Sequence, residues 1–256
     1  AQYENILKAS ISIATPNKKA NSSNSENYLK LALAASKSNA KFLYETNVGA
    51  GLPILSTLKD LQYSGDEIIK IEAVLSGTLS YIFNSFTGEK PFSEVVKEAQ
   101  IKGYTEPDPR DDLNGLDVAR KLLILARETG KLLDLKDISV ENLVPENCRK
   151  AANVEDFFVE LKKADNYFAE KQKQAAKKGE NLCYIASLQG EETKVNLQSI
   201  GPKHPFYSLS GSDNIISFTT SRYKNNPLVV KGPGAGAEVT AGGVFADILR
   251  ISNTSF

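Results

Sequence analysis

Four ionisable side chains lie close together at a point where the chain turns into an apolar segment. Glu106, Asp112 and Asp117 supply carboxylates, and Lys121 supplies an amine. Asp117 and Lys121 are four residues apart, so a helix places them on one face. Carboxylates can bind an ammonium group, and a lysine whose pKa is lowered by burial can act as a general acid. The spacing alone fits such a pocket and a capped helix with an exposed ion pair equally well.

The segment that carries these residues is predicted to be a stiff turn followed by a helix. Pro107 and Pro109 fix the backbone angle φ and hold the residue before each of them extended. Asp108 is expected to cap a helix whose first residue is Pro109. This helix should continue through the apolar run Leu122–Ala126 and end at Gly130.

Three further segments contain residues that could bind a ligand. Lys18 follows a predicted strand, and its residue type alone favours a solvated turn, although ligands bind beyond the carboxyl ends of strands in α/β sheets. Gly232–Gly236 opens a predicted helix and could equally cradle a phosphate or form a tight connection. Glu45–Leu52 fits a glycine turn, and its alternative is a small hard-cation site with oxygen ligands.

The histidine and the cysteines are expected to have structural roles. His204 is the single histidine and precedes a proline, which indicates a loop position and argues against a histidine-based zinc site. Cys148 and Cys183 are far apart in the chain and belong to no metal-binding pattern, so free thiols are expected.

The composition excludes several classes of protein. The 256 residues include 31 basic and 31 acidic side chains, which leaves no electrostatic footprint for nucleic acid. No apolar run reaches the roughly 18 residues that a membrane span needs. We therefore expect a cytoplasmic protein without nucleic-acid or membrane partners. The chain contains no methionine, which predicts that it is a piece of a longer protein.

Periodicity predicts an α/β protein. Helix and strand alternate in the first part, as at the end of a doubly wound domain, and several consecutive strands later in the chain indicate a partly antiparallel sheet. The predicted strands span residues 11–15, 41–44, 68–75, 183–188, 194–200, 214–223 and 228–231. The remaining predicted helices span residues 26–36, 52–61, 79–86, 92–103 (with Ser93 as N-cap), 155–178 and 239–251.

Several motifs together resemble homoserine dehydrogenase. They are Thr-Pro-Asn-Lys-Lys-Ala (15–20), Tyr-Glu-Thr-Asn-Val-Gly-Ala-Gly-Leu-Pro (44–53), Leu-Ser-Gly-Thr-Leu-Ser-Tyr-Ile-Phe-Asn (75–84), Gly-Tyr-Thr-Glu-Pro-Asp-Pro-Arg-Asp-Asp-Leu (103–113), Gly-Leu-Asp-Val-Ala-Arg-Lys (115–121), Gly-Pro-Gly-Ala-Gly (232–236) and Val-Thr-Ala-Gly-Gly-Val (239–244). The resemblance covers nearly the whole chain, and residues 122–130 look most like the bifunctional aspartokinase–homoserine dehydrogenases. An aspartokinase domain in a longer parent chain is therefore an expectation.

The resemblance implies a reversible, NAD(P)H-dependent reduction of L-aspartate 4-semialdehyde to L-homoserine in threonine and methionine biosynthesis. Lys121 would then donate a proton to the carbonyl oxygen, with electrostatic support from Asp112. Glu106 and Asp117 would bind the substrate, and Lys18 would lie between cofactor and substrate.

The same resemblance implies two ligands besides the substrate. Gly236 would approach the NAD or NADP cofactor, of which most of the site lies upstream of residue 1 with the glycine-rich loop. Sodium or another monovalent cation would bind Glu45 and the backbone carbonyl groups of Val48, Ala50 and Leu52.

The expected architecture has three parts. Residues 1–44 would be the remnant of a Rossmann-like dinucleotide domain, residues 45–229 a substrate-binding and dimerisation domain with a helix-covered mixed sheet, and residues 230–256 a segment that returns to the first domain. We expect a homodimer and little dehydrogenase activity from this chain by itself. The rival hypothesis is a non-catalytic assembly or regulatory module that keeps the fold.

Overall fold

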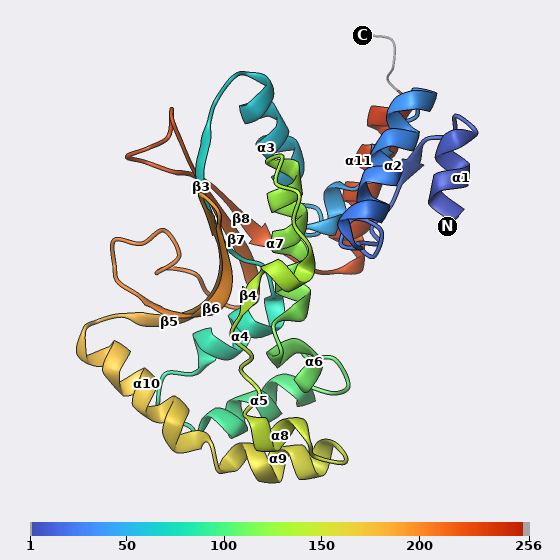
Figure 1. Ribbon diagram of the computed structural model, residues 1–256. Helices are drawn as coiled ribbons and strands as arrows, with labels where there is room; N and C mark the ends of the chain where they lie inside the picture. The colour runs from blue at the N-terminus through green and yellow to red at the C-terminus, as the bar shows by residue number, and fades with distance from the viewer. Residues whose placement is uncertain (1, 253–256) are drawn as a thin grey trace.

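The chain forms a six-stranded sheet covered by helices, with a small α/β unit packed at one end (Figure 1). This computed structural model describes residues 2–252, so the outermost residues of the predicted terminal parts lie outside the described range. The strands are β1 (Ile13–Ala14), β2 (Phe42–Leu43), β3 (Ile68–Val74), β4 (Ser139–Val140), β5 (Asn181–Gln189), β6 (Glu192–Ile200), β7 (Asp213–Thr220) and β8 (Leu228–Pro233). The helices, with η marking 3-10 turns, are α1 (Gln2–Lys8), α2 (Ser25–Ser38), η1 (Glu45–Asn47), α3 (Ile54–Tyr63), α4 (Gly77–Ser85), α5 (Phe92–Ile101), α6 (Arg110–Leu113), α7 (Leu116–Glu128), η2 (Leu135–Asp137), α8 (Glu146–Arg149), α9 (Val154–Lys162), α10 (Asp165–Lys177) and α11 (Ala237–Ser252).

The large sheet is mixed, as the sequence predicts. Its strand order is β4-β6-β5-β3-β7-β8, and β4 pairs with β6 in parallel while the other pairs are antiparallel. Strand β3 lies between strands that come much later in the chain, since Ile71 is opposite Leu188 on one side and Phe218 on the other. The carboxyl end of β3 is therefore enclosed by residues from distant parts of the sequence.

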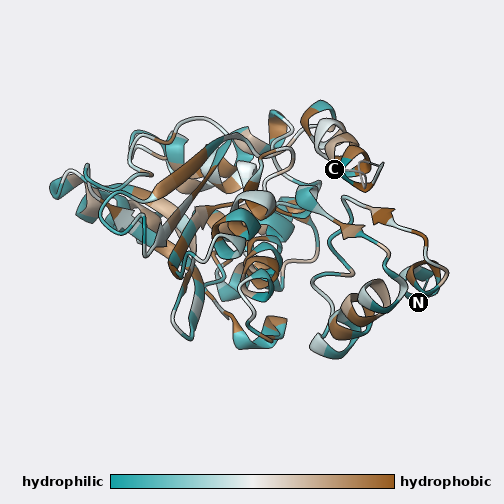
Figure 2. Ribbon diagram, turned by 90° about the horizontal axis from the view of Figure 1, so that it is seen from above, coloured by the Kyte–Doolittle hydropathy of each residue, from teal (hydrophilic) through white to brown (hydrophobic). Residues whose placement is uncertain are grey.

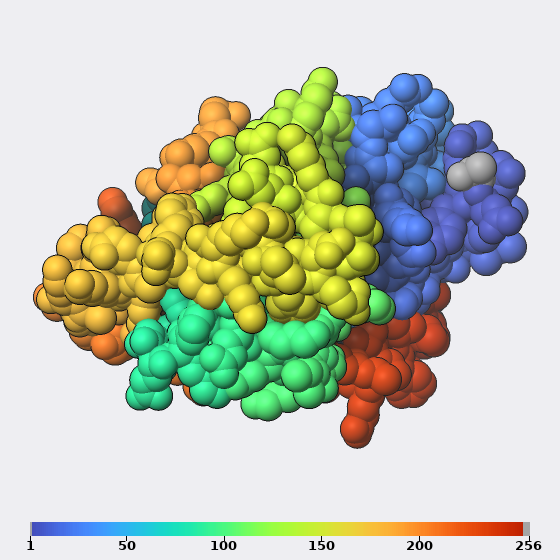
Figure 3. Space-filling view, turned by 90° about the horizontal axis from the view of Figure 1, so that it is seen from below, coloured from blue at the N-terminus to red at the C-terminus, as the bar shows by residue number. Residues whose placement is uncertain are grey.

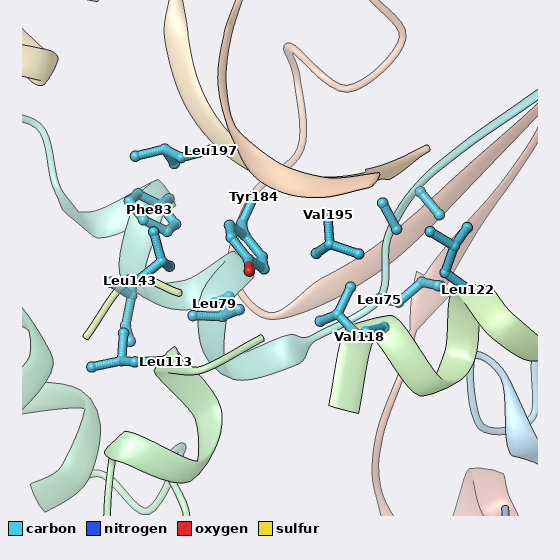
Figure 4. Close-up of a cluster of buried hydrophobic side chains, with 14 of the residues drawn as sticks. Leu75, Leu79, Phe83, Leu113, Val118, Leu122, Leu143, Tyr184, Val195 and Leu197 are labelled. Carbon is cyan, nitrogen blue, oxygen red and sulfur yellow. The ribbon is translucent and has the colours of Figure 1, made fainter. Parts of the chain in front are cut away.

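The main core lies between this sheet and helix α7. Side chains that alternate along a strand point to one face, and here that face meets the apolar stripe of the helix. Figure 4 shows Leu75, Val118 and Leu122 close together, with Val195 near them and the ring of Tyr184 next to Leu79. The whole run Leu122–Ala126 is at most 1% exposed, which fixes the rotation of α7 about its axis. A smaller cluster on the opposite face of the sheet includes residues of the connection between β6 and β7.

The small unit is built on the two-stranded parallel sheet of β1 and β2, in which Ile13 lies beside Phe42. Helices α1 and α2 pack on each other, and α11 returns from the far end of the chain to contact β1. Figure 2 shows both chain ends on this side of the molecule, and Figure 3 shows the amino-terminal residues against the middle of the chain. Apolar side chains stay exposed on its helices, with Leu33 at 54% and Phe245 at 60%.

Two predicted helices are interrupted. The helix expected from Pro109 begins at Arg110 and breaks at Gly115, whose φ of +74° glycine adopts readily. A side chain at this position would meet the Tyr184 hydroxyl, 2.0 Å from the ideal Cβ position. The helix expected over residues 155–178 is two helices, α9 and α10. The prediction of two uninterrupted helices is wrong in both places.

The predicted caps also differ in detail. Ser93 is not an N-cap but the second residue of α5, and its N–H and hydroxyl both donate to the Asp165 carboxylate at 2.7 Å. Asp108 lies one residue before the capping position, where its carboxylate accepts from the Arg110 N–H at 3.0 Å. No helix within residues 2–252 combines the length and apolar character needed to cross a membrane.

Candidate active site

Three charged side chains meet at the first turn of α7. The Asp117 carboxylate lies between two ammonium groups, with Oδ1 2.9 Å from Nζ of Lys18 and Oδ2 2.9 Å from Nζ of Lys121. The predicted pairing of Asp117 with Lys121 across one helical turn is thus present. Lys18 comes from the loop after β1, so the site joins the small unit to the main domain.

The Lys121 amine is fixed in position. Its side chain is only 13% exposed, and Nζ also donates to the Leu75 carbonyl oxygen at 2.7 Å, where β3 ends. Burial lowers the pKa of Lys121, and the nearby charge of Lys18 lowers it further against the attraction of Asp117. A buried amine with a lowered pKa is suited to donate a proton near neutral pH.

The carboxylate of Asp117 stays ionised. Burial by itself would raise the pKa of Asp117, but the charges of Lys121 and Lys18 outweigh it and lower the pKa to about 2. The carboxylate therefore carries its negative charge throughout the neutral range and holds the two amines close together.

Asp112 and Glu106 form a second group on the turn before α7. The Asp112 carboxylate accepts from the Glu106 backbone N–H at 2.8 Å and lies 3.0 Å from the Thr78 hydroxyl, whereas the Glu106 side chain points into solvent. Burial raises the pKa of Asp112, and the charges of Glu106 and Asp117 add to this effect. Asp112 also raises the pKa of Lys121. The two groups thus influence each other electrostatically without a direct ion pair between them in the described structure.

A pocket of about 880 Å³ opens beside the lysines. Lys18 and Lys121 line it together with Thr46 and the segment Gly234–Ala237. Gly236 has a φ of +123°, a conformation that L-residues with side chains rarely adopt, and it leads directly into α11. The structure therefore brings the predicted residues Lys18, Lys121 and Gly236 to one cavity, while Glu106, Asp112, Asp117 and Glu45 are not among its lining residues.

The segment from Glu45 to Leu52 folds against α3 and α11. The Glu45 carboxylate accepts from the backbone N–H groups of Leu55 at 2.6 Å and Ser56 at 2.9 Å, at the start of α3, and lies 3.4 Å from the Arg250 guanidinium. Carboxylate oxygens have further lone pairs, so these bonds leave acceptor capacity. Of the three predicted carbonyl ligands, Leu52 accepts from the Ile54 N–H, and Val48 and Ala50 lie on the turn between.

Three buried polar residues around the site were not identified from the sequence. The Asn21 amide donates to Oδ1 of Asn47 at 2.9 Å, and Asn47 donates to the Thr15 carbonyl at 3.0 Å. Arg127 lies at the other end of α7 and donates to the Asn21 carbonyl at 2.7 Å. A charged residue next to the apolar run Leu122–Ala126 is the one sequence signal that could have drawn attention to Arg127.

The histidine and cysteines lie where the sequence predicts no catalytic role. His204 is in a loop 3.7 Å from Glu72, and Cys148 and Cys183 are free and buried. Burial raises the pKa of the Cys183 thiol to about 12. Within the part of the chain that the structure describes, no three His, Cys, Asp or Glu side chains gather as a metal-binding cluster.

Comparison with known proteins identifies a consistent group of relatives. A model of the homoserine dehydrogenase family matches residues 53–249. A bifunctional aspartokinase/homoserine dehydrogenase from Zea mays is 53% identical over 255 residues, which are 99% of this chain and 28% of the maize protein. A homoserine dehydrogenase from Schizosaccharomyces pombe is 48% identical over 257 residues, covering 97% of this chain and 68% of the yeast protein. The chain thus spans less than a third of the plant relative.

Solved structures share the fold. A Candida auris protein described as of unknown function superposes with a TM-score of 0.94 at 43% identity, over 98% of this chain and 72% of that protein. A hyperthermophilic archaeal homoserine dehydrogenase in complex with NADPH has a TM-score of 0.74 at 24% identity, over 98% of this chain and 66% of that protein. The mixed α/β architecture around the lysine pair therefore recurs in a known group of structures.

Proposed function

Because the chain belongs to the homoserine dehydrogenase family, we propose that it carries the substrate-binding and proton-transfer part of an enzyme that interconverts L-aspartate 4-semialdehyde and L-homoserine with NADH or NADPH. The observation that carries this proposal is the contact of Lys18 and Lys121 with one carboxylate, Asp117, at the wall of a single pocket. A solvated surface ion pair would need neither the buried amine nor the pocket.

Lys121 is the proposed general acid. Reduction of an aldehyde places negative charge on its oxygen, and a nearby ammonium group stabilises that charge and supplies the proton. The lowered pKa of Lys121 makes this transfer easier, while Asp117 and the Leu75 carbonyl hold the amine in place. In the reverse direction the neutral amine would accept the proton of the homoserine hydroxyl.

Glu106 and Asp117 are the proposed substrate-binding carboxylates. Within residues 2–252, no basic side chain pairs with Glu106, whose exposed carboxylate is available to an ammonium group. Asp117 already binds two amines, so its part would be to share its charge with the substrate and the lysines. Asp112 holds the Glu106 backbone and supports Lys121 electrostatically.

A nicotinamide cofactor is expected to supply or accept the hydride. The residues present fit part of such a group, because the pocket beside Lys121 has the volume of a small-molecule site and Gly236 in its lining has no side chain to prevent close approach. We assign residues 1–44 and 230–256 to the dinucleotide-binding region and residues 45–229 to the catalytic domain. Strand β8 runs to Pro233, so the main sheet extends slightly past the second boundary.

The decisive experiment is a comparison of lysine variants in the complete gene product that contains this chain. Lys121→Ala should lower kcat roughly 10²–10⁴-fold if Lys121 is the general acid. Lys163→Ala, which removes an exposed lysine that caps the end of α9 and pairs with Glu160, is the matched control and should leave kcat unchanged. An unchanged kcat in Lys121→Ala would reject the assigned role of Lys121, whereas a complete lack of turnover by the unchanged gene product would favour the non-catalytic module.

A binding titration tests the proposed division of the site. L-homoserine and NADPH should each be titrated into this chain and into the complete gene product by calorimetry. We expect L-homoserine to bind both proteins and NADPH to bind the complete product more tightly. Equal NADPH binding, or native rates of turnover by this chain alone, would contradict the assignment of a partial cofactor site.

Three further assignments rest on the family. A monovalent cation at Glu45, Val48, Ala50 and Leu52 should raise the melting temperature when sodium replaces a large organic cation, and Glu45→Gln should abolish that rise. A homodimer formed through the large sheet, as the family resemblance implies, should appear in sedimentation experiments. A connected aspartokinase, proposed from the name of the plant relative, should appear in the mass and kinase activity of the complete gene product.

A further inference from the structure

Arg127 is a buried cation that binds the backbone of two separate segments. The residue is 4% exposed, although arginine is rarely buried without partners. Its guanidinium donates to the carbonyl oxygens of Asn21 at 2.7 Å, Ser23 at 2.8 Å and Leu133 at 2.8 and 3.2 Å. Asp134 is the single carboxylate near it in the described structure, at 3.4 Å. These contacts use the fork of donors that arginine presents and lysine lacks.

These contacts hold the end of the loop that carries Lys18. Within that loop, the Lys18 carbonyl accepts from both the N–H and the hydroxyl of Ser22 at 2.9 Å. The loop's other end is held through Asn47, which donates to the Thr15 carbonyl and accepts from the Asn21 amide. The backbone from Thr15 to Ser23 is thus fixed at both ends by buried hydrogen bonds.

Both ends of α7 contact the loop of residues 15–23 that carries Lys18. Its first two turns carry Asp117 and Lys121, and its last turn carries Arg127. The helix is held rigid between them by the buried run Leu122–Ala126. A loop fixed to one end of this helix therefore keeps a constant distance to the carboxylate at the other end.

We propose that Arg127 is a positioning residue for the proposed reaction, which holds the loop of residues 15–23 so that the Lys18 ammonium stays beside Asp117 and Lys121. This inference rests on the proposed function for its catalytic consequence, whereas the placement of Lys18 can be measured without turnover. Arg127 itself does not line the pocket and touches no reacting atom.

The proposal has an electrostatic consequence at Lys121. The charged groups that act on this amine are Asp117 and Asp112, which raise its pKa, and Lys18, which lowers it. Release of the loop would move Lys18 away and leave the two carboxylates unopposed. The pKa of Lys121 should then rise, an effect that a loss of stability alone does not produce.

The test measures the titration of the Lys121 side-chain amine by NMR in this chain, labelled with ¹⁵N at lysine. Arg127→Met should raise that pKa by at least about half a unit, because two like charges a few ångströms apart near a surface interact by more than this amount. Lys18→Met should give the same shift, and the double variant should shift it no further, since both changes remove one interaction. Arg149→Met is the control, because Arg149 also donates to a backbone carbonyl, that of Val144, away from Lys18.

A second variant protects the test against loss of folding. Arg127→Lys keeps the charge but not the fork, and we expect a folded protein with a smaller shift in the same direction. An unshifted Lys121 titration in folded Arg127→Lys and Arg127→Met would overturn the proposal, as would shifts that add in the double variant with Lys18→Met.

Kinetics of the complete gene product separate this inference from the proposed function. Arg127→Met should lower kcat/KM about tenfold or more and move the basic limb of its pH profile upward together with the NMR shift. If Lys121→Ala leaves turnover intact while Arg127→Met still shifts the Lys121 titration, the proposed role of Lys121 as general acid fails and the positioning stands. If Arg127→Met lowers activity without moving the pH profile, the residue is merely structural and the inference fails.

Discussion

The ionisation of Asp117 offers a quantitative test of the site in this chain alone. Two lysines at 2.9 Å lower the pKa of Asp117 from 3.8 to about 2. A shift of that size corresponds to roughly 2.5 kcal/mol. The side chain is 45% exposed, so solvent screening reduces the contribution to stability to about 1 kcal/mol. Because the pKa is lower in the folded protein, this stabilisation is present above pH 4 and is lost as the pH falls through 2.

The perturbation is Asp117→Asn, which keeps the shape of the side chain and removes its charge. Urea unfolding of both proteins at pH 7 should show the variant less stable by about 1 kcal/mol, and the difference should shrink as the pH falls below 4. Asp111→Asn changes an exposed carboxylate of α6 and should show a much smaller dependence on pH. Lys121→Met should raise the pKa of Asp117 measured by carboxyl NMR, because one of its two cations is gone. A titration of Asp117 near pH 4 in the unchanged chain would refute the described ion-pair geometry.

Three further predictions concern the fold that holds the site. Leu123→Ala should cost about 2–5 kcal/mol of unfolding free energy, because Leu123 is 0% exposed in the main core, and a smaller loss in thermal or urea unfolding would contradict that packing. Gly115→Ala should cost more than about 1 kcal/mol, from the strain of positive φ and the clash with the Tyr184 hydroxyl, whereas Gly103→Ala, with similar φ and open space around it, should show the strain alone. Cys183 should react with a disulfide reagent far more slowly in the native chain than in urea, since burial raises its pKa to about 12, and equal rates would contradict its burial.

Local patterns predicted the elements well. The strand expected at residues 68–75 is β3, and the apolar run Leu122–Ala126 is the most buried part of α7. These features depend on the periodicity of apolar side chains, which can be recognised within a single segment of the sequence. The ion pair of Asp117 with Lys121 was predictable for the same reason, because it needs only one helical turn.

The errors arise where distant residues decide the local structure. Ser93 has the residue type of an N-cap, but Asp165 from another helix supplies the acceptor. Gly115 lies at the break between α6 and α7, and its missing side chain leaves space for the hydroxyl of Tyr184, a residue on β5. The division between α9 and α10 has no glycine or proline to mark it.

The site was predictable in its parts and not in its assembly. Sequence and family resemblance named Lys18, Lys121 and Gly236, which lie around one pocket. The sequence distance between Lys18 and Asp117 does not predict their ion pair, because that ion pair depends on how the small unit packs on α7. Arg127 was missed for a related reason, since its partners are backbone carbonyl groups that no side-chain pattern identifies.

The central position of β3 has a consequence for how the chain is made. Strand β3 pairs with β5 and β7, so that Ile71 lies opposite Leu188 and Phe218. Both partner strands come much later in the chain and therefore leave the ribosome long after β3 does. Until then both edges of β3 are open, and its backbone groups can pair with other chains. Such late, non-local pairing also slows folding. We therefore expect nascent chains that stop before β7 to aggregate, and synthesis of the last third of this chain to set when its lysine pair first assembles.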